Sequence, residues 1–216
     1  MIIAGAELFT GNCLIVMAWA NRQLSTGEVL RNWTIIWLGN LVGALGLVGL
    51  VFMAHTGGMN GGRVGDAMVA LAVTKLTPDA VTIFFKAILC NVLVCLAVWL
   101  SYAGRSVTDK LMGMVLPVSA FIAAGFEHCV ANMFLLPIGW LMVVTGHAPA
   151  GVDVGAFGVG PIAVNIAAAT AGNIVGGAGI VGLIYWTIYR KSLGGLSPVE
   201  PPADRQPAQT SSAAAE

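Results

Sequence analysis

The sequence predicts an all-α membrane protein that is organised as an inverted repeat with broken helices. Of its 216 residues, 57% are hydrophobic and only 9% are Asp, Glu, Lys or Arg, whereas soluble domains carry roughly 25% charged residues. A helix needs about 20 apolar residues to cross a hydrocarbon core of about 30 Å. The apolar stretches that are long enough cover residues 32–54, 80–104, 111–146 and 161–189.

Two short patterns occur in both halves of the chain and in the same order, which indicates an internal duplication. The pattern G-x-E-x-x-x-x-N occupies residues 5–12 and 125–132, and a G-N-x-V-G pattern occupies residues 39–43 and 172–176. Duplication is a common plan in transporters, where the corresponding parts often line the substrate path. An odd number of membrane crossings between equivalent points makes the two repeats antiparallel, so we expect an inverted repeat.

The third apolar stretch, 111–146, is too long for a single membrane crossing. As one straight helix it would measure about 54 Å at 1.5 Å per residue, well beyond the bilayer. We therefore expect it to bend or break, with Pro117, Gly125 and Pro137 as candidate break points. Non-helical backbone at that depth is tolerated only inside protein or along a water-lined cavity.

Glu127 and His128 lie near the middle of this stretch and are its only Asp, Glu, His, Lys or Arg residues. An ionisable residue at bilayer depth costs several kcal/mol and marks an ion or proton route by default. Imidazole is the side chain that titrates near neutral pH without assistance. Glu127 matches Glu7 in the first half and is therefore read as a structural brace, whereas His128 matches Leu8 and has no ionisable counterpart.

Positive charge is distributed unevenly between the two sides that these crossings define. The segments 55–79 and 147–160 hold only Arg63 and Lys75. We therefore expect a multi-pass protein of the inner (plasma) membrane. The positive-inside bias places these two segments outside the cell and the C-terminus in the cytoplasm. The opposite side holds Arg22, Arg31, Arg105, Lys110, Arg190 and Lys191.

The composition changes at Gly194, where the last apolar stretch has ended. Residues 194–216 are rich in Pro, Ser, Ala and charged residues, so we expect them to form a disordered cytoplasmic tail. Residues 1–193 are expected to form the transmembrane channel domain. The formal net charge of zero leaves no basic surface to neutralise phosphates, which argues against a nucleic-acid partner.

Cysteine usage and the remaining motifs point away from metal binding and catalysis. Cys13, Cys90, Cys95 and Cys129 lie in or beside apolar segments, with neither the spacing of a zinc site nor a disulfide framework. We read them as small core residues. No nucleophile with an adjacent base, phosphate loop or metal cluster is evident, so we expect neither an enzyme nor a cofactor.

The chain contains four long motifs, which are AELFTGN at 6–12, NVLVCLAVWLSYAGRSVTDK at 91–110, GFEHCVANMFLLPIG at 125–139 and GNIVGG at 172–177. These motifs resemble the formate/nitrite transporter family, and the GRS-x-x-DK loop is most similar to its formate-channel branch. The resemblance implies six transmembrane helices in an aquaporin-like inverted repeat, broken second and fifth helices, and a homopentamer with one pore per protomer. Against this plan the chain begins partway through the second helix, so we expect about four and a half helices.

The resemblance also implies roles for individual polar residues. His128 resembles the central pore histidine of the family, and Thr10 resembles the loop threonine that faces it. Glu127 resembles the neighbouring carboxylate that braces the broken segment. Lys75, just before Pro78 in the outer loop, stands where the family has a lysine that draws anions toward the entrance.

Apolar and amide side chains complete the implied pore. Leu8, Phe9 and Phe121 resemble members of the two hydrophobic constrictions. Asn91 and Asn173 resemble the polar groups of the chamber between them. Without the resemblance, the apolar residues would be read as helix packing and the amides as bonds between helices.

These features predict transport of formate or a related small monovalent weak-acid anion such as nitrite, with proton coupling. An anion between apolar constrictions faces a large desolvation penalty, so His128 is expected to lend a proton in the chamber. One alternative is an aquaporin-like neutral-solute channel, which needs no titratable group at its centre. The other is a non-transporting membrane subunit with a haem, quinone or docking site, which the outer-loop positions of His55 and His147 do not favour.

Overall fold

Helices form the secondary structure of the described part of the chain, which in this computed structural model comprises residues 2–3, 5–147 and 149–193. The predicted disordered tail lies outside these residues. Within them, three helical runs are long and apolar enough to cross a membrane, in agreement with the sequence. They are α3 (Thr26–Met53), α5 (Ala80–Ala103) and the run Val159–Arg190.

The last of these runs is continuous but changes its winding where it meets α5. A Cβ atom on Gly176 would collide with the Ile88 carbonyl, and one on Gly177 would collide with the side-chain amide of Asn91. Glycine at these positions therefore lets the two helices approach at backbone distance, and a π-helical stretch of this kind often marks a functional site. The run consists of α8 (Val159–Ile174), the π-helix η3 (Val175–Gly182) and α9 (Leu183–Leu193).

The long apolar stretch is broken as predicted, between α6 (Val107–Ala123) and α7 (Cys129–Val144). The break falls at Gly125, whose φ of +64° is readily adopted only without a Cβ. The expectation that Pro117 and Pro137 also break the chain was wrong, because each lies inside a helix. In membrane helices, neighbouring groups and local adjustments satisfy the backbone carbonyl that a proline leaves free.

The segment between α3 and α5 was expected to be an outer loop, and for most of its length this was wrong. It contains η2 (Thr56–Gly58) and α4 (Arg63–Leu76), and α4 packs against α7. Val69 and Ala72, which lie on the packed face of α4, are fully buried. The helix thereby carries Lys75, in its last turn, into the interior.

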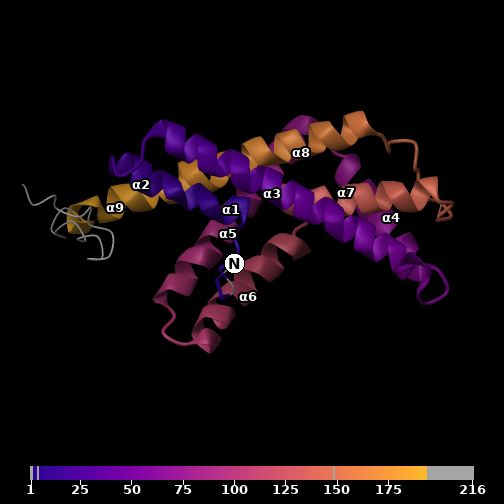
Figure 1. Ribbon diagram of the computed structural model, residues 1–216, viewed down its shortest axis with the longest axis horizontal. Helices are drawn as coiled ribbons and strands as arrows, with labels where there is room; N and C mark the ends of the chain where they lie inside the picture. The colour runs from indigo at the N-terminus through magenta and orange to yellow at the C-terminus, as the bar shows by residue number, and fades with distance from the viewer. Residues whose placement is uncertain (1, 4, 148, 194–216) are drawn as a thin grey trace, which may run out of the picture.

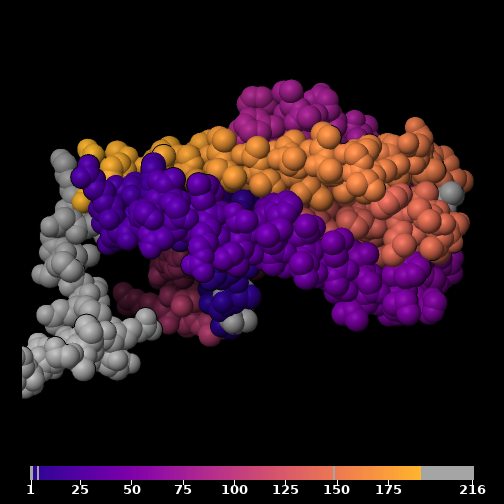
Figure 2. Space-filling model, turned by 45° about the horizontal axis from the view of Figure 1, so that its top comes forward, coloured from indigo at the N-terminus to yellow at the C-terminus, as the bar shows by residue number. Residues whose placement is uncertain are grey.

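Short helices at the start of the chain begin near the centre of the molecule and end at α2 (Val16–Ala20), beside α9 (Figure 1). They are α1 (Phe9–Asn12), η1 (Cys13–Ile15) and α2. Figure 1 shows α3, α7 and the α8–α9 run extending along the long axis, while α5 and α6 form a hairpin that projects to one side. In Figure 2 the α8–α9 run lies beside α2 and α3 along the length of the molecule. The start of α1 and the start of α7 meet near the middle, where Thr10 contacts His128.

Candidate functional site

His128 forms the N-cap of α7 and is held at both ring nitrogens. The Ala131 amide donates to Nδ1 at 3.1 Å, and Nε2 lies 3.0 Å from the Thr10 hydroxyl oxygen. Because Nδ1 accepts a hydrogen bond, the neutral ring carries its proton on Nε2 and donates it to Thr10. The structure thus brings together two predicted site residues that are 118 positions apart, and both side chains are buried.

A cavity of about 330 Å³ opens beside His128. Phe121 forms part of its wall and stacks on the imidazole, with ring centroids 5.8 Å apart and an interplanar angle of 18°. The charged side chains in the wall are Lys75, Lys86 and Glu127. A titratable ring therefore faces a small space that has both aromatic and charged walls.

Glu127 is almost completely buried and is held by two partners. Its Oε1 lies 3.0 Å from Lys75 Nζ, and its Oε2 accepts from the Asn132 amide at 2.7 Å. Lys75 also donates to the Phe126 carbonyl at 2.8 Å. The expected position of Lys75 in an entrance loop was therefore wrong, because the side chain is only 15% exposed and ion-paired inside the protein.

Asn173 and Asn91 are completely buried and bind backbone groups where helices cross. Asn173 accepts from the Cys129 amide at 2.9 Å and donates to the carbonyls of Ala87 and Glu127 at 2.8 and 3.0 Å. Asn91 donates to the Asn173 carbonyl at 2.6 Å. Neither amide lines the cavity beside His128, so their role in a chamber stays a prediction.

The residues predicted for the two constrictions do not all line this cavity. Phe121 lines the cavity, whereas Leu8 and Phe9 do not. Phe9 is only 2% exposed and packs edge-on against Trp33, with ring centroids 6.4 Å apart. Leu8 is half-buried and precedes α1 in extended conformation.

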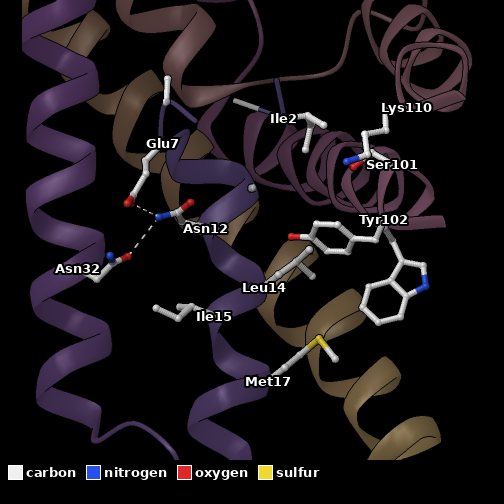
Figure 3. A pocket seen from close by; sticks show the side chains of 13 residues that line it. Ile2, Glu7, Asn12, Leu14, Ile15, Met17, Asn32, Ser101, Tyr102 and Lys110 are labelled. Atoms are coloured by element: carbon white, nitrogen blue, oxygen red, sulfur yellow. Dashed lines mark hydrogen bonds between the residues drawn. The ribbon is translucent and has the colours of Figure 1, made fainter. Parts of the chain in front are cut away.

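A hydrogen-bond network ties the loop before α1 to α3. The Asn12 amide donates to Glu7 Oε2 at 2.6 Å and to Asn32 Oδ1 at 3.3 Å, as Figure 3 shows. Asn40 accepts from the Phe9 amide at 2.9 Å and donates to the Glu7 carbonyl at 3.0 Å. The two asparagines of α3 therefore hold both ends of the turn that begins α1.

The second half of the chain makes the same bonds with equivalent residues. Asn132 donates to the Glu127 carboxylate and to Asn165 at 2.7 and 2.8 Å. Asn173 accepts from the Cys129 amide and donates to the Glu127 carbonyl. Each of the four hydrogen bonds therefore has a counterpart in the other half. This match is expected of a duplicated unit and agrees with the repeat that the sequence patterns indicate.

The two networks differ in charge. Glu127 is paired with Lys75, whereas the part of the chain that the structure describes supplies no ion pair to Glu7. Glu7 is exposed and lines a separate cavity of about 580 Å³, with Lys110 also in its wall. Only the second network therefore places a buried, neutralised carboxylate beside the histidine.

Sequence reasoning missed Lys86, Asn32 and Asn165. Each asparagine lies eight positions before the asparagine of the G-N-x-V-G pattern, so extending that pattern toward the N-terminus would have found both. Lys86 could also have been found from the sequence, because a charged residue within an apolar span indicates a functional site. A lysine near a helix end is easily read as reaching the membrane surface.

The cysteine prediction is confirmed, since Cys13, Cys90, Cys95 and Cys129 are all buried and free. Among the described residues, no group of three or more His, Cys, Asp or Glu side chains is placed to hold a metal ion.

Comparison with known proteins agrees with this architecture. The profile of the family described as "Formate/nitrite transporter" matches residues 1–187. The formate channel FocA of Escherichia coli is 40% identical over 200 residues, which cover 87% of this chain and 69% of that protein. FocA of Haemophilus influenzae is 37% identical over 194 residues, which cover 85% and 67%.

Solved structures are similar as well. A "Pentameric formate channel with formate bound" matches with a TM-score of 0.75 at 35% identity, covering 88% of this chain and 77% of that one. An "FNT family ion channel" matches with a TM-score of 0.72 at 34% identity, covering 87% and 71%. The predicted all-α membrane fold is confirmed, whereas its likeness to aquaporins stays a prediction. The chain belongs to the formate/nitrite transporter family.

Proposed function

We propose that this protein transports formate or a related small monovalent weak-acid anion, such as nitrite, across a membrane, with proton coupling through His128. The observation that carries this proposal is the position of His128, which is held by Thr10 at the break between α6 and α7 and lines a cavity together with Phe121. The names of the relatives support formate as a substrate.

The proton step follows from the hydrogen bonds of the ring. The neutral imidazole donates Nε2–H to the Thr10 hydroxyl and accepts the Ala131 amide proton with its Nδ1 lone pair. A second proton must occupy that lone pair, so it displaces the amide and frees the first turn of α7. The imidazolium can then lend a proton to the anion, and the amide bond forms again when the neutral ring returns.

Lending a proton helps because of the surroundings. A bare anion loses its hydration between apolar side chains at a cost of several kcal/mol, whereas the neutral acid does not. The charged neighbours in the cavity wall are the Lys75–Glu127 pair and Lys86. The anion would thus enter a cavity that has charged side chains in its wall and leave it past apolar side chains as formic or nitrous acid.

Assembly and orientation are part of the proposal. A homopentamer is supported by the pentameric relative, and placement in the inner membrane with a cytoplasmic C-terminus is supported by the distribution of Lys and Arg. The relatives are described as channels and transporters, so we propose a carrier of solutes and not an enzyme.

The experiment is uptake of labelled formate and nitrite into proteoliposomes between pH 5.5 and 8. His128→Asn keeps an oxygen that can accept the Ala131 amide, but it cannot titrate. We expect the variant to fold and to lose the pH dependence of uptake, while the control His55→Asn behaves as the wild type. Asparagine suits the control because it tolerates the positive φ of 51° at that position.

Two results would count against the proposal. An unchanged pH profile in His128→Asn would remove the proton-donor role. Vesicle swelling in glycerol without uptake of either anion would indicate a neutral-solute channel instead.

A further inference from the structure

Lys86 is the charged residue of the cavity that the proposed mechanism leaves unused. It lies in the second turn of α5, between an outward face, where Phe85 and Leu89 are more than half exposed, and a buried face with Ala87 and Cys90. Lys86 itself is half-buried and lines the cavity beside His128. A lysine in such an apolar helix is costly and marks a functional site by default.

The charges in the cavity wall do not cancel. Lys75 and Glu127 form an ion pair at 3.0 Å, which leaves no net charge at that position. Lys86 makes no hydrogen bond or ion pair to any described residue. Two lysines against one glutamate therefore give the wall one net positive charge, and Lys86 carries it.

The rest of the wall increases the effect of this charge. Phe121, Ile122 and Leu135 contribute apolar surface, which excludes water and lowers the local dielectric constant, so that the attraction of an anion is less screened than in solution. An ammonium group offers three donors on a flexible stem, which suits a small anion that must also be released.

We propose that Lys86, and not the neutralised Lys75, holds the permeating anion in the cavity beside His128. The ligand class is a small monovalent carboxylate or oxoanion, and the inference rests on the proposed function. It assigns to Lys75 a bracing role on Glu127 and leaves anion attraction to a residue on a different helix.

The kinetic test measures initial rates of formate uptake against formate concentration in proteoliposomes of the full chain. Lys86→Met removes the charge at similar volume, and we expect its half-saturating concentration to rise about tenfold. Lys86→Arg should restore it to within about threefold, because the charge returns. The control Arg63→Met removes an exposed positive charge from the first turn of α4 and should match the wild type.

A binding test on the same proteins separates this inference from transport itself. Formate that binds the folded state raises the midpoint of thermal unfolding, so sodium formate should stabilise the wild type and Lys86→Arg more than Lys86→Met. If Lys86→Met fails to fold, Lys86→Gln replaces it in both tests.

The outcomes are distinguishable. Formate-dependent stabilisation that requires Lys86, in a protein without formate uptake, would support the binding site and refute the transport function. Equal half-saturation and equal stabilisation in Lys86→Met and the wild type would overturn the inference, as would a wild type with neither saturation nor stabilisation. A stability loss in Lys86→Met that is the same with and without formate would also overturn it and assign Lys86 to lipid or to a neighbouring copy.

Discussion

Replacing Lys75 by methionine removes the cation that faces the buried carboxylate of Glu127. Their charged atoms are 3.0 Å apart, and Coulomb's law with an effective dielectric constant of 20 gives about 5–6 kcal/mol at that separation. Breaking a buried pair costs about 3–5 kcal/mol, because the remaining charge stays desolvated. Since Lys75 is 15% exposed and Asn132 still binds the carboxylate, we expect a loss of about 3 kcal/mol in the free energy of unfolding.

The assay is equilibrium unfolding in mixed detergent micelles, with Glu127→Gln and the double variant completing a cycle. Glutamine keeps an oxygen for the Asn132 amide but carries no charge, so the double variant should recover about 2 kcal/mol relative to Lys75→Met. Arg63→Met, an exposed substitution, should change stability by less than about 0.5 kcal/mol. The reasoning is refuted if Lys75→Met is as stable as the wild type, or if the double variant is no more stable than Lys75→Met.

Three further substitutions test other contacts. Thr10→Val removes the oxygen that accepts a hydrogen bond from His128 and should lower the rate of formate uptake about tenfold. Thr10→Ser keeps this oxygen and should keep the wild-type rate. Equal rates in Thr10→Val and the wild type would contradict the assigned hydrogen bond. Gly177→Ala places a methyl group against an amide and two cysteine side chains and should cost about 1–3 kcal/mol in unfolding, while Gly179→Ala, which meets open space, should be neutral. Asn173→Ala removes three hydrogen bonds to backbone groups and should cost about 3 kcal/mol. A loss below about 1 kcal/mol in the same unfolding assay would be inconsistent with this geometry.

Much of the fold could be read from composition and length. The stretch 80–104 became α5 almost residue for residue, because an apolar run of that length has few other stable states in a bilayer. Gly125 marked the break correctly, since a positive φ is readily adopted there. The matching hydrogen-bond networks were also indicated by the sequence, because the repeated patterns contain three of the four side chains in each network.

Sequence patterns were less informative where packing decides. The helix α4 was missed because charged residues such as Arg63 and Asp66 break the continuity of apolar residues along the sequence. Its buried face is recognisable only once α7 covers Val69 and Ala72. Pro117 was a misleading signal, because a proline does not end a helix whose neighbours compensate for the lost bond.

The sequence by itself determined that this chain lies in a membrane, that its long apolar stretch must break, and that His128 is the singular group at the break. These conclusions depend on local properties, namely hydrophobicity, length and the cost of an intramembrane charge. Tertiary structure alone decided that Lys75 pairs with Glu127, 52 positions away, and that Lys86 lines the cavity. Which side chains meet depends on how each helix is rotated and packed, and no local pattern specifies that rotation.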